Sequence, residues 1–299
     1  MHKSGYVAIV GLPNSGKSTL LNTLLGQKLA ITNMKPQTTR KRILGVLTEK
    51  DYQIIFFDTP GIINSSYLLQ EKMMGEVEQA ISHADITLLL IDALRDPQGK
   101  KSLNHEFVKM WISRKNKSTI LILNKVDLIS QQEAKDLLKY FEELKRFTSI
   151  ILVSALHGFN IDKLVQSIIL SLPEGPSYYP DDVIAVENER FFVSEIIREK
   201  ILELYRDEIP YSCEVIVTEF KERENVKDYI NAEIVVERES QRKIIIGKDG
   251  SSIKKLGKIA REAVEDFLQS KVFLELRVKV RSKWRSDENW LRKFGYGDK

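Results

Sequence analysis

The sequence predicts two successive domains: an α/β domain with a mostly parallel sheet and helices on both faces, and then a smaller α+β domain. Three observations lead to this prediction. Apolar runs of strand length alternate with helical patterns as far as Leu172, and several runs end in an acid or an amide. Pro173-Glu-Gly-Pro176 then ends the last helix and favours an extended connection. Beyond it, the charge balance changes sign along the chain.

The first strand and helix flank a glycine-rich loop that reads GLPNSGKS at residues 11–18. The apolar run 6–10 precedes it and the helical pattern 19–25 follows. A strand that delivers such a loop to a helix N-terminus directs backbone N–H groups at a polyphosphate. Lys17 would reach the outer phosphates and Ser18 would bind Mg²⁺. The predicted nucleotide contacts of this segment are Gly11, Leu12, Pro13, Asn14, Ser15, Gly16, Lys17, Ser18 and Thr19.

A second motif, Asn124-Lys125-Val126-Asp127, follows the strand-like run 119–123 and indicates guanine. The Asp127 carboxylate would accept hydrogen bonds from the ring N–H and the exocyclic amine of guanine, and adenine offers neither. A buried polar group without its partner rejects the wrong base by about 10⁴ or more. Asn124 would hold the base edge, and the aliphatic stem of Lys125 would cover the purine face.

The strand run 54–57 ends in Asp58-Thr59-Pro60-Gly61. Asp58 would hold Mg²⁺ through water, and the Gly61 N–H would contact the terminal phosphate. The polar segment 33–42 offers Thr38 and Thr39 as a second hydroxyl ligand for Mg²⁺, and Thr39 is the preferred choice. Ser154 and Ala155, after the strand run 150–153, would complete the base pocket.

These five elements resemble those of the translation-factor-like GTPases over residues 5–172, with GTP, GDP and Mg²⁺ as the implied ligands. Ile62 stands where Ras has the glutamine that orients water, so hydrolysis is expected to be slow, at about 10⁻⁴ s⁻¹ or a modest multiple. In relatives with this replacement an asparagine of the phosphate loop helps to place K⁺, which implies Asn14 here. The predicted catalytic residues are Lys17, Asn14, Thr39 and Gly61.

Composition places the chain among ordinary globular proteins, with 299 residues of which 42% are apolar and 29% charged. No apolar run approaches eighteen residues, and the N-terminus continues directly into the first strand, so neither export nor membrane spanning is expected. The single cysteine, Cys213, is expected to be buried and structural. A cytoplasmic location follows from these features.

The second half predicts a helix, two strands, a helix pair around a loop and a last strand. The expected elements are a helix at 189–205, strands at 213–220 and 229–237, a short apolar run to Ile246, a helix at 251–268 and a strand at 272–280. The resulting boundaries are a nucleotide domain at 1–175, a linker at 176–182, and a C-terminal domain with a basic tail at 183–299.

The loop Gly247-Lys248-Asp249-Gly250 matches the GxxG clamp of KH modules, which grips the backbone of single-stranded nucleotides. Residues 181–239 carry 8 basic and 17 acidic residues, whereas residues 240–299 carry 16 basic and 8 acidic residues. A basic surface on the GxxG side suits phosphate. The aromatic and basic tail from Trp284 to Phe294 would either stack bases or cap the domain core.

A GTPase domain with NKVD and Ile62 joined to a GKDG module resembles the Era family of bacterial ribosome-assembly GTPases over essentially the whole chain. The resemblance implies a type II KH domain that binds the 3′ end of 16S ribosomal RNA through Gly247, Lys248, Asp249 and Gly250. It also implies a role in 30S subunit assembly and rRNA maturation, with the chain acting as a monomer. Peripheral association with the inner face of the cell membrane is a further implication.

Two other functions use part of the same pattern. A metabolic P-loop kinase would share the phosphate loop but would not need Asp127. A trafficking or cell-cycle GTPase would keep every nucleotide motif and use the basic C-terminal domain as an anchor to a membrane or a protein.

Overall fold

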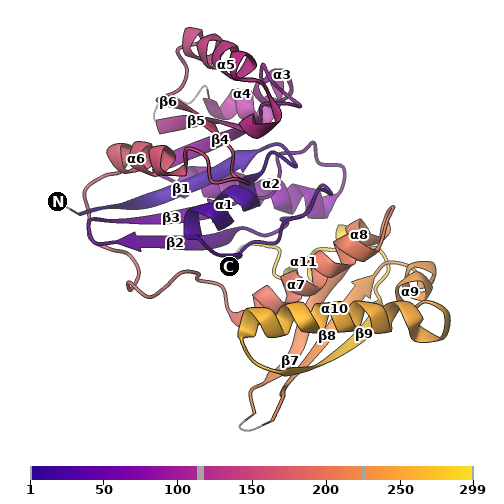
Figure 1. Cartoon of the computed structure of the whole chain (residues 1–299). Helices are drawn as coiled ribbons and strands as arrows, with labels where there is room; N and C mark the ends of the chain where they lie inside the picture. Colours follow the sequence, from indigo (N-terminus) through magenta and orange to yellow (C-terminus); the bar gives the residue numbers. More distant parts are fainter. Residues whose placement is uncertain (1, 113–117, 224–225, 298–299) are drawn as a thin grey trace. The chain divides into compact units, whose positions relative to one another are not determined.

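The computed structural model describes residues 2–112, 118–223 and 226–297. Contacts between Cα atoms divide the chain into two compact units, one made of residues 1–64 and 73–186 and the other of residues 65–72 and 187–299 (Figure 1). Each unit has its own buried apolar core. The predicted domains, residues 1–175 and 183–299, remain a prediction, because contact-based units do not define functional domains.

The first unit is built on a six-stranded sheet in the order β2-β3-β1-β4-β5-β6. All neighbouring pairs are parallel except β2 with β3, which places β2 antiparallel at one edge. The strands are β1 (Lys3–Gly11), β2 (Ile43–Glu49), β3 (Tyr52–Asp58), β4 (Ile86–Asp92), β5 (Ser118–Asn124) and β6 (Ser149–Val153).

Helices cover both faces of this sheet, which confirms the predicted α/β class. Side chains of α2, α4 and α5 pack in one core cluster with alternate residues of β1, β4 and β5, and α1 and α6 contact each other and the strands β1, β3 and β6. The helices are α1 (Lys17–Leu25), α2 (Leu68–His83), α3 (Lys100–Asn104), α4 (Glu106–Ile112), α5 (Gln131–Glu143) and α6 (Ile161–Ser171), with a 3₁₀ turn η1 at Val126–Leu128.

The parallel strands explain why the chemically important residues gather at one edge of the sheet. Every residue of β4 is buried, as expected for a strand covered on both faces, so its polar residue is confined to the end. The strands β1, β3, β4 and β5 end at Gly11, Asp58, Asp92 and Asn124 respectively, and Asp92 lies directly beside Asn124 in the register. Ligands of open parallel sheets bind at this carboxyl edge.

The second unit has the predicted α+β order around a sheet β7-β8-β9, in which β7 and β8 are antiparallel and β8 and β9 are parallel. Alternate residues of β8 pack with α7 and α10 on one face of the sheet. The elements are α7 (Glu189–Leu204), α8 (Ile209–Ser212), β7 (Glu214–Lys221), β8 (Asp228–Val236), α9 (Glu239–Ile246), η2 (Lys248–Gly250), α10 (Ser251–Leu268), β9 (Val272–Val280), η3 (Trp284–Ser286) and α11 (Glu288–Lys293).

The helix before the GxxG loop, predicted as the first of a helix pair, is α9, and it begins at Glu239, upstream of the apolar run that ends at Ile246. The side-chain Oε1 of Gln241 accepts hydrogen bonds from the backbone N–H groups of Glu237 (2.9 Å) and Arg238 (3.0 Å), which fixes the start of α9. Gln241 is 3% exposed. Such a turn-stabilising side chain does not change the hydrophobic period, so the pattern alone did not show where the helix begins.

The aromatic tail mainly caps the core of the second unit. Trp284, Phe294 and Tyr296 are buried, and the Trp284 Nε1–H donates to the carbonyl oxygen of Ser212 (3.0 Å). Trp290 is only half-buried, with Arg281 and Lys293 within 5 Å of its ring centre. Among the aromatic residues from Trp284 to Phe294, Trp290 is therefore the one whose ring is accessible enough to stack on a base.

Cys213 is buried, in agreement with its predicted structural role. Its thiol donates to the carbonyl oxygen of Ile209 at 2.9 Å.

Candidate nucleotide site and GxxG loop

The phosphate loop connects β1 to α1 in a shape that requires glycine at position 16. Gly16 has a φ of 100°, and a Cβ built on it would lie 2.2 Å from Nδ2 of Asn124. Asn124 in turn donates to the carbonyl oxygen of Ser15 at 2.8 Å. The loop is therefore held directly against the end of β5.

Lys17 lies beneath the loop, where it is 6% exposed. Its ammonium donates to the carbonyl oxygens of Gly11 (3.2 Å) and Leu12 (3.1 Å). Burial lowers the Lys17 pKa to about 8, and the nearby Asp58 charge acts in the opposite direction. A buried cation whose ammonium is hydrogen-bonded to two neutral carbonyl oxygens is well suited to gain an anionic partner.

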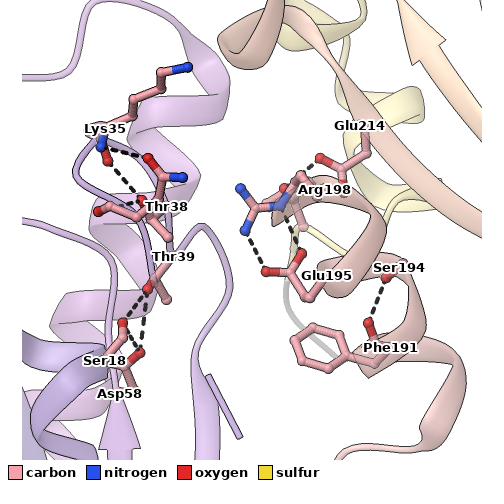
Figure 2. Close-up of polar contacts among 12 residues, drawn as sticks. Ser18, Lys35, Thr38, Thr39, Asp58, Phe191, Ser194, Glu195, Arg198 and Glu214 are labelled. Carbon is pink, nitrogen blue, oxygen red and sulfur yellow. Dashed lines mark hydrogen bonds and ion pairs between the residues drawn. The ribbon is translucent and has the colours of Figure 1, made fainter. Parts of the chain in front are cut away.

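Three oxygen atoms meet where the predicted metal ligands converge (Figure 2). The Ser18 hydroxyl lies 2.7 Å from Oδ2 of Asp58 and 2.8 Å from the Thr39 hydroxyl, and Thr39 lies 3.3 Å from the same Asp58 oxygen. Burial raises the Asp58 pKa to about 6, against the hydrogen bond from Ser18 and the charge of Lys17. Hydroxyl and carboxylate oxygens are the donors that Mg²⁺ prefers, so the donor set fits this ion.

The neighbouring threonine has a different environment. The Thr38 hydroxyl donates to the carbonyl oxygens of Lys35 (2.7 Å) and Asn33 (3.4 Å), within its own loop (Figure 2). The geometry thus favours the predicted choice of Thr39 over Thr38 as the hydroxyl nearest to Asp58.

Asn124 connects the phosphate loop to the predicted base pocket. Besides its bond to Ser15, its Oδ1 accepts from the backbone N–H of Ala155 at 3.0 Å, and the residue is 2% exposed. Its side chain therefore connects the phosphate loop to the loop that follows β6. The expected contact with the base edge stays a prediction.

Lys125 is held by Asp92, a residue that the sequence reasoning missed. The Lys125 ammonium lies 2.6 Å from Oδ2 of Asp92 and donates to the carbonyl oxygen of Asn14, also at 2.6 Å. Asp92 is 8% exposed. The signal was present in the sequence, because Asp92 ends an apolar strand just as Asp58 does.

These residues surround one cavity of about 450 Å³. Its walls also include Asp127, which lies 3.8 Å from the His157 ring nitrogen, and the phosphate-loop residue Asn14. The predicted site residues that line the cavity are Pro13, Asn14, Gly16, Lys17, Ser18, Thr19, Thr39, Gly61, Asn124, Lys125, Asp127 and Ala155. The other predicted site residues are not among those that line the cavity: Gly11, Leu12, Ser15, Asp58, Thr59, Pro60, Ile62 and Ser154.

Ile62 is 1% exposed and belongs to the core of the first unit. Its backbone N–H donates to the carbonyl oxygen of Gly11 at 3.0 Å. The side chain therefore packs in the interior, and only its backbone supports the loop. Gly61 is tightly placed as well, since a Cβ there would lie 2.8 Å from Pro13.

The GxxG loop joins α9 to α10 in the second unit. Gly247 and Gly250 have φ values of 72° and 75°, and Lys248 and Asp249 between them are exposed. A Cβ on Gly247 would lie 2.3 Å from the Ser252 hydroxyl, whereas one on Gly250 would meet only Lys254 at 3.9 Å. The loop thus presents bare backbone and a lysine at the N-terminus of a long helix, which is a favourable place for phosphate.

Comparison with known proteins agrees with both halves of this description. Residues 6–125 match the family model described as 50S ribosome-binding GTPase, and residues 208–285 match the KH domain model. A GTPase Era of Clostridium botulinum is 43% identical over 99% of this chain and 99% of its own length. The chloroplastic GTPase ERA1 of Zea mays is 48% identical over 99% of this chain and 71% of its own.

Solved structures show the same similarity in three dimensions. A crystal structure of Era in complex with MgGDPNP and nucleotides 1506–1542 of 16S ribosomal RNA has a TM-score of 0.90 and 41% identity over the whole of both chains. An Era variant of Aquifex aeolicus bound to GDP and AlF₄⁻ has a TM-score of 0.89, also at 41% identity, and covers 99% of this chain and 100% of its own. With its phosphate loop, its buried oxygen cluster and its KH fold, the chain belongs to the Era family of GTPases.

Proposed function

We propose that the chain is a GTP-hydrolysing switch that binds the 3′ end of 16S ribosomal RNA through its KH domain and assists 30S subunit assembly and rRNA maturation. The observation that carries this proposal is the presence, in one chain, of two separate glycine loops whose surroundings suit phosphate. The first borders the cavity shared by Lys17, Ser18, Thr39 and Asp127. The second is the exposed GxxG loop. The complex of a relative with a GTP analogue and 16S rRNA supports the pairing of these two ligands.

In the nucleotide site, Lys17 and the loop N–H groups would hold the phosphates, and Asp127 would read guanine. Asn124 and Lys125 would fix the shape of the pocket through their bonds to Ser15 and Asn14. Calorimetry with GTP and ATP tests this proposal. A clear preference for GTP is expected, and comparable affinities for the two nucleotides would contradict it.

Ser18, Thr39 and Asp58 would hold Mg²⁺, Asp58 acting through water. The bound ion would supply positive charge against the phosphates. Thr39 and the Gly61 N–H would then be held in place only while the terminal phosphate is present, and the segments that carry them would be released after hydrolysis.

Hydrolysis itself is expected to be slow, because the buried Ile62 cannot orient water by hydrogen bonding. K⁺ placed by Asn14 would supply part of the missing charge. Asn14 has a φ of 64° and lines the cavity, which supports its candidacy. Single-turnover hydrolysis should be faster in K⁺ than in Na⁺, and equal rates would argue against the ion.

The sharpest test of the RNA clamp is Gly250→Asp. A Cβ at this position meets only the Lys254 side chain at an ordinary contact distance of 3.9 Å, and aspartate tolerates positive φ better than most residues do, so the loop is expected to keep its shape while gaining a negative charge. Affinity for a single-stranded RNA with the 3′-end sequence of 16S rRNA should fall at least about tenfold. Gly247→Asp is a less specific probe, because its side chain would collide with Ser252.

A matched control adds the same charge elsewhere. Gly75→Asp lies on α2, where a Cβ meets nothing within 4 Å, and RNA affinity should be unchanged. If Gly250→Asp binds RNA like the wild type, the loop is not the clamp. The alternative of a GTPase that uses its basic C-terminal domain as an anchor at a membrane surface or a protein partner would then be favoured.

We further expect the chain to act as a monomer in the cytoplasm. No helix in the described ranges has both the length and the apolar character needed to cross a membrane.

A further inference from the structure

Residues 178–186, a segment that includes part of the predicted linker, lie along the outer edge of β2. β2 is the edge strand of the large sheet (Figure 1). On its free side, Gly45 forms an antiparallel bridge with Ala185, and the Val46 N–H donates to the carbonyl oxygen of Ile184 at 2.8 Å. An edge strand offers a row of unpaired N–H and C=O groups. Here part of that row is occupied by residues of the same chain.

Gln53, on the neighbouring strand β3, holds the beginning of this segment. Its side chain is fully buried. Its Oε1 accepts from the backbone N–H groups of Tyr178 (2.7 Å) and Tyr179 (3.0 Å), and its Nε2 donates to the carbonyl oxygen of Tyr179 (2.8 Å). The second Nε2 hydrogen is used by the Thr48 hydroxyl at 3.0 Å. Two donors and two acceptor positions are thus satisfied, three of them by the segment's backbone.

Aromatic packing adds to this attachment. The ring of Tyr178 lies 5.1 Å from that of Tyr6, which stacks on Phe57 at 5.3 Å. The rest of the segment is less tightly held, since Ile184 and Val186 are 43% and 46% exposed. Hydrogen bonds to Gln53 and to the β2 edge are therefore the main restraints on residues 178–186, which we call the strap.

We propose that the strap is a detachable extension of the sheet, docked by Gln53 and the edge of β2, and that its docking sets the reach between the nucleotide domain and the KH domain. Helix α7 begins at Glu189 and is capped by Asn188, so a docked strap leaves almost no free chain before the KH domain. Release of residues 178–186 would add roughly 30 Å of extended chain.

The position of β2 connects the strap to the nucleotide site. β2 starts at Ile43, which pairs with Asp58, and Thr39 contacts the same Asp58 just upstream. Loss of the Thr39 contact would free the start of β2 and weaken its edge near Gly45. The strap is then docked in the GTP state and released in the GDP state. This coupling rests on the proposed role of Thr39, whereas docking by Gln53 does not.

Hydrogen exchange followed by mass spectrometry tests docking on the full-length chain. Amides of the strap should exchange at least about tenfold faster in Gln53→Ala than in the wild type, because several hydrogen bonds are lost together. Tyr179→Pro removes one strap N–H that donates to Gln53 but leaves the buried Gln53 side chain itself unchanged. It should also speed up exchange of the strap amides. Gln132→Ala, at an exposed glutamine of α5, is the matched control and should leave strap exchange unchanged.

Unchanged strap exchange in both Gln53→Ala and Tyr179→Pro would overturn the proposal. The coupling has its own test, in which wild-type strap exchange is compared with Mg²⁺-GDPNP and with Mg²⁺-GDP bound. Faster exchange with GDP is expected, and equal exchange in the two states would overturn the coupling. GTP and RNA affinities of the same variants are measured separately, so that a failure of the proposed function is distinguished from a failure of the strap.

Discussion

Replacing Asp58 with asparagine is expected to stabilise the chain in the absence of nucleotide and Mg²⁺, although Asp58 belongs to the nucleotide site. Burial raises the Asp58 pKa from 3.8 to about 6, against the Ser18 hydrogen bond and the Lys17 charge. Because the folded pKa is the higher one, the folded chain binds more protons between these values, and stability falls as pH rises from about 4 to 6. The difference corresponds to about 3 kcal/mol above pH 6 for a fully buried carboxyl.

Urea unfolding in EDTA between pH 4.5 and 8 would show this effect. Unfolding of the first unit is followed through hydrogen exchange of the buried amides of β4. The free energy of unfolding of Asp58→Asn should exceed that of the wild type by an amount that grows up to pH 6 and then levels off. A difference that stays constant with pH would refute the electrostatic reasoning, as would a less stable variant. Addition of Mg²⁺-GDP should reverse the order, because the variant loses the carboxylate of the metal site.

Three further substitutions probe other contacts. Asp127→Asn should weaken GTP binding by about 10²-fold and leave ATP binding unchanged in calorimetry, since two charge-assisted hydrogen bonds are specific to guanine. Thr39→Val should lower Mg²⁺-dependent affinity for a fluorescent GTP analogue about tenfold, whereas Thr38→Val, whose hydroxyl donates to the carbonyl oxygen of Lys35, should not. Arg198→Ala, which leaves the buried Glu195 without its ion-pair partner (Figure 2), should destabilise the KH domain by about 3–5 kcal/mol in urea, with partial recovery when Glu195→Gln is added.

The nucleotide half was largely predictable because its motifs are local. A strand, a glycine loop and a helix start follow one another between Lys3 and Leu25, and the structure places them at these positions. Asp58 and Asn124 were found for the same reason, since each ends an apolar run whose burial on both faces excludes polar residues from its middle.

The partners of these residues were not predictable, because they are distant in sequence. Asn124 bonds to Ser15 across 109 positions, and Gln53 bonds to Tyr179 across 126. Neither pair leaves a trace in composition or period. Gln53 reads as an ordinary polar residue near the start of a strand, and only the register of the sheet brings the strap to it.

The two glycine loops show why one site depends on the whole domain and the other on a short segment. The shape of the phosphate loop is fixed by Asn124, which also holds Ala155, so phosphate binding and base recognition share one brace and should fail together when it is lost. The GxxG loop is held by contacts that are close in sequence, since the Gly250 N–H donates to the carbonyl oxygen of Gly247 and Ser252 packs against Gly247. Its function therefore depends on local backbone and surface charge. A substitution elsewhere in the KH sheet should change the stability of that domain before it changes RNA affinity, whereas in the nucleotide domain stability and affinity should change together.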